Sequence, residues 1–449
     1  MNQHYTVYYI RTAEEVGGEL IPAKSDHTSL MKGSASQALK PLTSTLPLAS
    51  GHLPTETVET ITTSSDVHLT LECAMSRRLG QPRRALPILQ PHNPARLGRR
   101  HLHLAPPFLL DDYTPRYQLL TSIQAAKKRS QAYAHLSNCN LCPRLCGVNR
   151  YEKTGTCLVG SDVVVNTVAP HFGEEPFFQG HNGSGSVFFS GCNLRCVFCQ
   201  NHDIAHQKNG FSLTPEELAE WYMKLQDVGN VHNINLVTPE HVVPQVVLSI
   251  LTARDLGLKI PIIYNTSSFD SLASIELLDG LVDIYLPDFK VWSPVSSKRL
   301  LKADNYAEVA VESIKAMHKQ VGDLCFTPDG IAKSGVCIRH LVMPGKEDEG
   351  REIVRWLAEN VSKDLFVHVM EQYHPRAHVG KEKRSRVGRA AEIIEPGGVE
   401  ASAQAQKEVR YSDINRPVDL KEVQSVTKAA RDAGLWRFVE VAEHGGFNI

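Results

Sequence analysis

The chain has 449 residues, of which 42% are hydrophobic and 22% charged, and its formal net charge at pH 7 is −1. This composition is typical of a globular protein with a large hydrophobic core, and the length allows two or three domains. The near-zero net charge argues against a general electrostatic preference for nucleic acid or acidic membranes. The sequence also lacks a run of about 18 apolar residues, the minimum for a membrane span, so neither a membrane nor a nucleic acid is indicated as a partner.

Residues 1–110 are predicted to form a largely disordered N-terminal extension, because they are rich in Ser, Thr, Pro and His with little hydrophobic periodicity. The start of the chain lacks the basic and apolar regions of a secretory signal. Between Met75 and Leu110 there are seven arginines and no acidic residue. This composition is typical of a mitochondrial transit peptide. We therefore expect a cytoplasmic protein, or a mitochondrial one if translation starts at Met75. A basic disordered linker is the alternative interpretation.

A helix followed by a cysteine-rich metal-binding segment is predicted over residues 117–175. Residues 117–137 have a helix-forming composition. Four cysteines follow with the spacing C-x2-C-x3-C-x10-C, namely Cys139, Cys142, Cys146 and Cys157. Four thiolates at such spacings satisfy a closed zinc site or a fully coordinated iron–sulfur cluster. The sequence leaves open which metal is bound, and whether its role is structural or electron relay.

Residues 184–375 are predicted to form the core of an α/β fold, because short β-branched runs alternate with amphipathic stretches. Such alternation indicates βαβ units around a parallel sheet. Six units predict a partial (β/α)6 barrel, open on one side, in place of a closed eight-fold barrel. The predicted strands are 186–191, 234–239, 260–267, 282–289, 336–345 and 365–373.

The helices and the C-terminal part are predicted from local signals. Thr214, Pro215 and Glu217 form a capping box with proline at the first helical position, so a helix should begin there. Residues 376–410 are charged and rich in small residues, which predicts an exposed loop. Residues 411–449 are predicted to form a helix and a strand that close the fold.

Three cysteines directly follow the first predicted strand of this core. Cys192, Cys196 and Cys199 have the spacing C-x3-C-x2-C. Functional groups of parallel barrels collect on loops at the carboxyl ends of the strands, and thiolates are preferred ligands of zinc and of iron–sulfur clusters. A [4Fe–4S] cluster with three cysteine ligands leaves one iron open for a substrate or cofactor. A zinc site of three cysteines and a distant histidine is the alternative.

This loop resembles the signature of the radical S-adenosylmethionine (SAM) superfamily, with Phe198 in the aromatic position before the third cysteine. The resemblance covers about residues 135–375 and is to the branch similar to pyruvate formate-lyase activating enzyme, which includes uncharacterised PflX-like iron–sulfur proteins. The blocks that carry it are CNLCPRLCGVNR, HFGEEPF, GSGSVFFSGCNLRCVFCQN, NINLVTPEH, YNTSSF, DIYLPDFK and IRHLVMPG.

The resemblance implies a radical SAM enzyme. In that family the cluster binds SAM, and one electron cleaves SAM to methionine and a 5′-deoxyadenosyl radical that abstracts hydrogen from a substrate. The resemblance further implies a one-electron donor, such as a flavodoxin- or ferredoxin-type protein. The substrate, a protein or a small molecule, is not identified, although activating enzymes suggest a protein glycyl residue. A non-catalytic iron–sulfur or zinc-binding scaffold on the same barrel is the alternative.

Candidate SAM-binding residues follow from the resemblance and from position at predicted strand ends. Phe198 is expected near the adenine, or packed on the barrel. Thr238 and Glu240 lie where the superfamily often has a Gly-Gly-Glu turn for the SAM amino group, although the glycines are absent here. Asn265 and Ser267 end the third strand and are candidates for the SAM carboxylate or ribose.

The later predicted strands supply three more candidates. Asp288 and Lys290, in PDFK, resemble an Asp-Leu-Lys element that lies beside SAM in the activating enzymes. A surface ion pair is the alternative for these two residues. Arg339, on the fifth predicted strand, is a further candidate at the same edge of the sheet.

Overall fold

The computed structural model describes residues 105–382 and 408–439. The predicted N-terminal extension, 1–110, and its transit-like segment, 75–110, lie outside the described residues except for 105–110. Most of the predicted loop 376–410 also lies outside them. No helix in the described part of the chain is long and apolar enough to cross a membrane.

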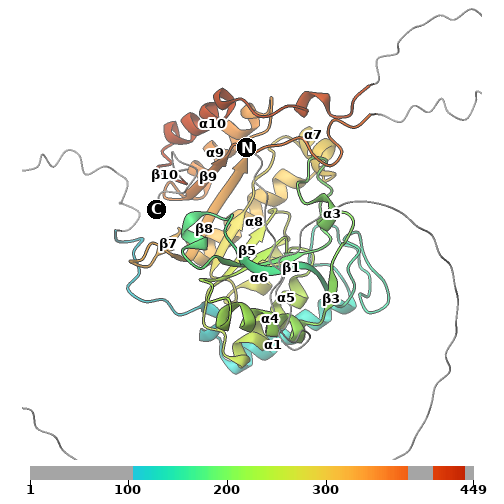
Figure 1. Ribbon diagram of the computed structural model, residues 1–449, viewed down its shortest axis with the longest axis vertical. Helices are drawn as coiled ribbons and strands as arrows, with labels where there is room; N and C mark the ends of the chain where they lie inside the picture. Colours follow the sequence, from blue (N-terminus) through green and yellow to red (C-terminus); the bar gives the residue numbers. More distant parts are fainter. Residues whose placement is uncertain (1–104, 383–407, 440–449) are drawn as a thin grey trace, which may run out of the picture. The chain divides into compact units, whose positions relative to one another are not determined.

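A ten-stranded, mostly parallel sheet forms the centre of the described residues (Figure 1). The order of the strands is β10-β9-β8-β6-β5-β4-β2-β1-β3, and β7 pairs with β8. The bounds are β1 Val163–His171, β2 Ser184–Phe189, β3 Phe211–Leu213, β4 Ile234–Val237, β5 Ile262–Thr266, β6 Ile284–Pro287, β7 Cys325–Phe326, β8 Ala332–Leu341, β9 Phe366–Met370 and β10 Arg437–Phe438.

The predicted fold class is confirmed. The strands β2, β4, β5, β6, β8 and β9 pair in parallel in chain order, each within or overlapping a predicted strand, and the short β10 adds a further parallel partner to β9. Among the described residues the edge strands β3 and β10 do not pair with each other, so the sheet stays open. This is the arrangement of a partial barrel.

Helices connect the consecutive parallel strands and cover the sheet (Figure 1). Helices α1, α4 and α5 pack together at the lower edge of the view, and α9 packs against α10 at the upper edge. The bounds are η3 Arg116–Leu119, α1 Ser122–Ser137, α2 Pro176–Gln179, α3 His202–Ala205, α4 Pro215–Asp227, α5 Val243–Leu256, α6 Leu272–Leu278, α7 Pro294–Ser296, η4 Ser297–Leu301, α8 Tyr306–Val321, α9 Glu347–Asn360, η6 Ser412–Ile414 and α10 Leu420–Asp432.

The capping box predicted at the start of α4 is present. The Thr214 side chain accepts a hydrogen bond from the Glu217 N–H, and the Glu217 side chain accepts one from the Thr214 N–H. These contacts satisfy two backbone donors that would otherwise be unpaired at the helix start. The helix therefore begins where the local sequence alone places it.

Strand β1 was not among the predicted strands. It pairs antiparallel with β2, with Val168 opposite Val187. Only its first three residues are buried, and it contains Pro170 near its end. The segment consequently lacks the continuous apolar run that marks the parallel strands. Its pairing covers the outer edge of β2, from which the cysteine loop emerges.

Asp283 fixes the chain that precedes α1 to the amino end of β6. Its carboxylate accepts hydrogen bonds from the Tyr113 hydroxyl and from the N–H groups of Arg116 and Ile262, each at 2.7 Å. Burial is the main influence on the carboxyl and raises the pKa of Asp283 to about 6. This contact lies at the end of the sheet opposite to the candidate site.

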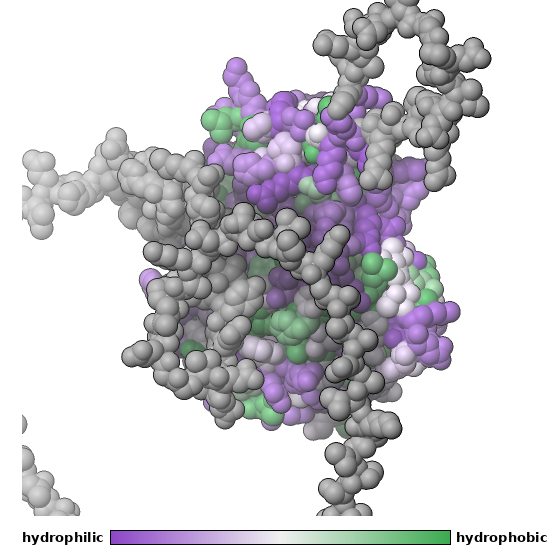
Figure 2. Space-filling view, turned by 45° about the vertical axis from the view of Figure 1, so that its right-hand side comes forward, coloured by the Kyte–Doolittle hydropathy of each residue, from purple (hydrophilic) through white to green (hydrophobic). Residues whose placement is uncertain are grey.

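The surface combines hydrophilic and hydrophobic regions. Figure 2 shows hydrophilic residues over the upper part of the visible face and hydrophobic residues gathered in patches below. Such a mixture is usual for a surface in contact with water. Polar side chains are buried at the carboxyl ends of the parallel strands, among them Glu240 and Asn265.

Candidate functional site

The loop that follows β2 carries three free thiols. Cys192 and Cys196 are buried, Cys199 is partly exposed, and none of the three forms a disulfide. The Leu194 N–H donates a hydrogen bond to the Cys192 sulfur at 3.3 Å. The sequence-predicted ligands are therefore brought together on one short loop.

Backbone contacts fix the path of this loop. The N–H groups of Arg195 and Val197 donate to carbonyls of η4 at 3.1 Å and 2.9 Å. Gly191 has φ +83°, and a Cβ there would lie 2.7 Å from the Cys157 carbonyl oxygen. Only glycine fits this turn without strain. The loop conformation is thus set by the protein backbone.

Burial raises the pKa of all three thiols, which favours the protonated form while no metal is bound. Burial raises the pKa of Cys196 to about 12, although the nearby Lys290 ammonium acts in the opposite direction. Metal binding to such thiols releases protons because the thiolate is the ligand. Lys290 places a positive charge where thiolates would accumulate negative charge.

Arg339 links the ends of several strands. Its guanidinium donates to Asp288 at 2.8 Å, to Asn265 at 2.6 Å and to Glu174 at 3.3 Å. The second carboxylate oxygen of Asp288 accepts from the Lys290 ammonium at 2.6 Å. The structure therefore joins four sequence-predicted residues to Glu174, which the sequence analysis did not select.

Asp288 remains ionised between two cations. Burial tends to raise its pKa, but Arg339 and Lys290 outweigh burial and lower the pKa of Asp288 to about 2. The side chains of Asp288 and Lys290 are 18% and 19% exposed. This ion pair thus lies within the strand ends and is only partly accessible to solvent.

Glu240 presents a buried oxygen that has no hydrogen-bond partner in the described part of the chain. Glu240 is 1% exposed, and its other oxygen accepts from the Ser267 N–H at 3.2 Å and from the Ser267 hydroxyl. Burial raises the pKa of Glu240. Thr238, at φ +61°, begins the turn that leads to Glu240 and donates its N–H to the Asn265 carbonyl at 2.9 Å.

Phe198, in the cysteine loop, packs against Tyr373 of the segment after β9. Its ring is buried, and its centroid lies 6.1 Å from that of Tyr373 with a tilt of 55°. This contact closes one side of the cysteine loop. The structure thus gives the packing partner of Phe198, and contact with an adenine remains a prediction.

Two of the four upstream cysteines, Cys139 and Cys157, contact Arg150, which is itself buried. The guanidinium donates to the Cys139 sulfur at 3.2 Å and to the Cys157 sulfur at 3.6 Å. The Thr156 N–H donates to the Cys146 sulfur at 3.4 Å. Burial raises the pKa of Cys139, although the Arg150 guanidinium acts in the opposite direction, and burial raises the pKa of Cys142 to about 12. Cys142, also buried, completes this group of four free thiols.

The two segments that carry the cysteine groups are in direct contact. The Arg195 guanidinium, from the loop after β2, donates to the Thr156 carbonyl at 2.8 Å, and Arg144 donates to the Asn193 carbonyl at 2.7 Å. A small cavity separates the upstream group from the end of β4. Its lining includes Cys139, Cys142, Arg150, Glu240 and His241.

Three charged residues of this region were missed by the sequence analysis. Glu174 contacts Arg339, and the Glu175 carboxylate accepts a hydrogen bond from His368 Nδ1 at 2.8 Å. Arg150 contacts the upstream cysteines. These residues lie inside the blocks HFGEEPF and CNLCPRLCGVNR, but the sequence does not show which strand ends they reach.

The residues present fit an iron–sulfur cluster with three protein ligands and a bound cofactor. Three free thiols on one loop supply the donor set of such a cluster. The unpartnered Glu240 oxygen is an acceptor for a cationic group, and Lys290 is a donor for an anionic one. SAM carries both an amino and a carboxylate group.

Comparison with known proteins gives two matches in sequence. Residues 186–357 match the family described as the radical SAM superfamily. The chain is 32% identical over 306 residues to an uncharacterized protein of Methanocaldococcus jannaschii, and this match covers 66% of the chain and 75% of that protein.

Two solved structures are also similar. Native anSMEcpe with bound AdoMet is 13% identical, with a TM-score of 0.34 and coverage of 56% of this chain and 61% of that one. Methylornithine synthase is 14% identical, with a TM-score of 0.28 and coverage of 57% and 61%. The chain therefore spans less than two thirds of the length of either structure.

Proposed function

The chain belongs to the radical SAM superfamily, and on this premise we propose that Cys192, Cys196 and Cys199 bind a [4Fe–4S] cluster whose open iron takes SAM. When bound, the cluster and SAM supply reductive cleavage to methionine and a 5′-deoxyadenosyl radical that abstracts hydrogen from the substrate. The observation that carries this proposal is the set of three free thiols on one backbone-fixed loop after β2.

The polar residues at the strand ends orient SAM. The free oxygen of Glu240 accepts from the SAM ammonium, while Ser267 fixes the other oxygen. Lys290 has three donor hydrogens and uses one on Asp288, so it can also reach the SAM carboxylate. Arg339 is a positioning residue, because each of its three nitrogens donates to a neighbouring side chain.

Tyr306 holds the ends of β5 and β6 in register around these residues. Its hydroxyl contacts the Ser267 and Asp288 carbonyls and the Lys290 N–H, each at 2.9 Å. It is fully buried. Because these side chains are fixed before the cofactor binds, less conformational entropy is lost on binding. Thr238, Asn265 and Phe198 complete the shell and keep water from the site.

The upstream cysteines bind a second metal centre, either a [4Fe–4S] cluster or zinc. Support comes from the three hydrogen bonds that Arg150 and Thr156 donate to their sulfurs. The Thr156 carbonyl accepts a hydrogen bond from Arg195 of the loop after β2, so a metal at the upstream cysteines would stabilise that loop. A cluster at this position would also relay electrons. Iron and zinc contents of the wild type and of Cys142→Ser distinguish the two metals.

The enzyme requires a one-electron donor, for which a flavodoxin- or ferredoxin-type protein is proposed. Cys199 and Cys146 are the partly exposed members of their groups, so electrons can enter at either centre. Replacing dithionite with reduced flavodoxin or ferredoxin in a SAM-cleavage assay tests this. Cleavage with dithionite but with neither protein would contradict the proposed donor class.

A protein glycyl residue is the proposed source of the abstracted hydrogen, on the resemblance to activating enzymes. The test uses protein fractions from cells grown on deuterated glycine. Transfer of deuterium to 5′-deoxyadenosine supports a glycyl substrate. Transfer from fractions labelled at other positions, and none from glycine, would contradict it.

The proposed activity is tested by anaerobic reconstitution with iron and sulfide, followed by dithionite and SAM. We expect 5′-deoxyadenosine from the wild type and none from Cys196→Ser. Cys325→Ser, a partly buried cysteine outside both groups, is the matched control and should retain the activity. A reconstituted wild type that binds iron but never cleaves SAM would favour the non-catalytic scaffold.

A cytoplasmic location is proposed, or a mitochondrial one if translation starts at Met75. The arginine-rich composition of residues 75–110 supports the mitochondrial form. Imaging of a tagged chain that begins at Met75 tests the second form. A purely cytosolic signal would contradict it.

A further inference from the structure

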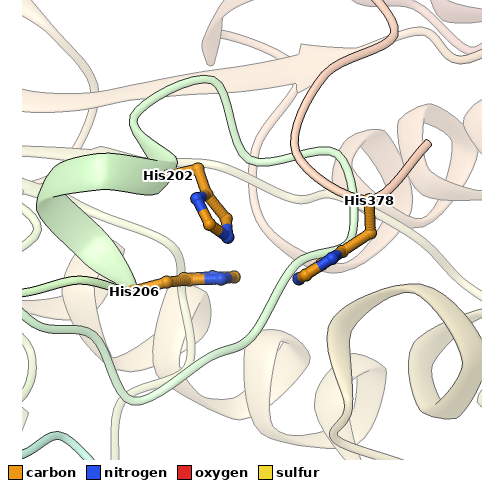
Figure 3. Close-up of side chains that lie close together, drawn as sticks. All are labelled: His202, His206 and His378. Atoms are coloured by element: carbon orange, nitrogen blue, oxygen red, sulfur yellow. The ribbon is translucent and has the colours of Figure 1, made fainter. Parts of the chain in front are cut away.

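Three histidines converge beside the cysteine loop, outside the site described above. Figure 3 shows the rings of His202, His206 and His378 pointing toward one another. One ring nitrogen from each lies within 4.8 Å of the other two. His202 begins α3 and His206 directly follows it, so the spacing of four places both on one helical face. His378 comes from the segment after β9.

The two segments that carry these histidines are joined by backbone and amide contacts. The His378 N–H donates to the Val197 carbonyl at 2.9 Å, and the His206 N–H donates to the His202 carbonyl at 2.9 Å. The Gln200 side chain donates to the Gln372 carbonyl at 3.2 Å. The convergence of the three rings is thus fixed by contacts that do not involve the rings themselves.

The environment of His206 and His378 favours the neutral form that binds metals. All three side chains are partly buried. Burial and the neighbouring His202 lower the pKa of His206 to about 4, and the same two causes lower the pKa of His378. Three protonated imidazoles at this separation would repel one another. Neutral imidazole is the form that ligates metal ions.

We propose that His202, His206 and His378 form a third metal site, for a divalent transition metal and best suited to Zn²⁺. Imidazole ligands suit zinc, copper, iron and nickel, and zinc accepts three histidines with a fourth position open to water. The metal would clamp the segment around residue 378 onto the cysteine loop. The proposal uses no ligand of the proposed function and does not depend on SAM cleavage.

The test uses zinc as the probe on full-length protein already reconstituted with iron and sulfide. The protein is treated with Zn²⁺, desalted, and analysed for zinc and by X-ray absorption at the zinc edge. We expect about one more zinc in the wild type than in His206→Gln or His378→Gln, with nitrogen or oxygen ligands at about 2.0–2.1 Å. His181→Gln, an exposed histidine elsewhere, is the matched control and should retain the zinc.

Equal zinc in the wild type and both variants, or wild-type zinc that shows only sulfur ligands, would overturn the proposal. Zinc bound by the upstream cysteines adds equally to all samples, so the difference remains informative. Iron content and circular dichroism identify a variant that fails to fold. His206 and His378 lie on different segments. If one of the two variants fails to fold, the zinc content of the other variant tests the proposal.

Discussion

Arg339 donates hydrogen bonds to residues from three different segments: Asp288 after β6, Asn265 on β5 and Glu174 before α2. Sequence reasoning could place Asp288, Asn265 and Arg339 at one edge of the sheet, because the carboxyl ends of parallel strands share an edge. It could not place Glu174, which follows an antiparallel strand and reaches the site only through the tertiary fold.

Replacing Arg339 with lysine should weaken SAM binding while the positive charge is kept. Lysine cannot donate to three acceptors in the geometry of a guanidinium. Loss of one such charged hydrogen bond costs about 1.5–3 kcal/mol, so we expect the dissociation constant of SAM to rise at least about tenfold. Equilibrium binding to the reconstituted protein measures this. Arg299→Lys, at a surface ion pair, serves as the control, and equal affinities in all three proteins would contradict a positioning role.

Replacing Glu240 with glutamine should separate function from stability. The free carboxylate oxygen is expected to bind the SAM ammonium, so the dissociation constant should rise about tenfold to a hundredfold. Because burial raises the pKa of Glu240, removing this charge should not lower the free energy of unfolding without SAM. Titration with SAM and urea unfolding give the two values.

The matched control for that variant is Glu217→Gln at the start of α4. Glutamine fills the same position of the capping box at the start of α1, so this variant should change neither stability nor SAM affinity. If Glu240→Gln instead lost stability and bound SAM normally, Glu240 would be a structural residue only.

At the scale of the elements, the parallel strands were predictable because they are buried on both faces and read as β-branched runs. The start of α4 was predictable from its capping box. Strand β1 was not, because most of it is only partly buried and its role as partner to β2 depends on a pairing distant in sequence. The contact between the two segments that carry the cysteine groups likewise depends on side chains of Arg195 and Arg144 that carry no sequence signal.

The anchor of the N-terminal segment on β6 predicts a specific pH dependence. The folded pKa of Asp283 is about 6, above the ordinary value of about 3.9. The folded state therefore binds this proton more tightly than the unfolded state, and the associated stability is present at low pH and lost as pH rises through 6. Relative to Asp283→Asn, the wild type should lose about 1.4 kcal/mol between pH 5 and pH 8.

Urea unfolding of both proteins at several pH values measures that difference. The comparison with the variant cancels the titration of the other groups. A difference that stays constant from pH 5 to pH 8, or that grows as pH rises, would contradict the assignment of a raised pKa to Asp283.

At the scale of the whole molecule, the sequence predicted an open α/β sheet with two cysteine groups, and the described residues have that sheet. Composition and spacing could not predict that the two cysteine-bearing segments contact each other near the ends of β2 and β4. The four upstream cysteines and the three cysteines after β2 therefore belong to one region of the molecule. In this region Glu240, Cys139 and Cys142 line the same cavity. The proposed function places SAM at this region.

Cys192, Cys196 and Cys199 are proposed to bind a [4Fe–4S] cluster with one iron left open, and SAM is proposed to bind that iron through its amino group. The most direct measurement is electron–nuclear double resonance on the reduced, reconstituted protein with SAM labelled with ¹⁵N at that position. We expect a ¹⁵N coupling to the cluster in the wild type and in Cys325→Ser. A reduced cluster signal with bound SAM and no such coupling would contradict it.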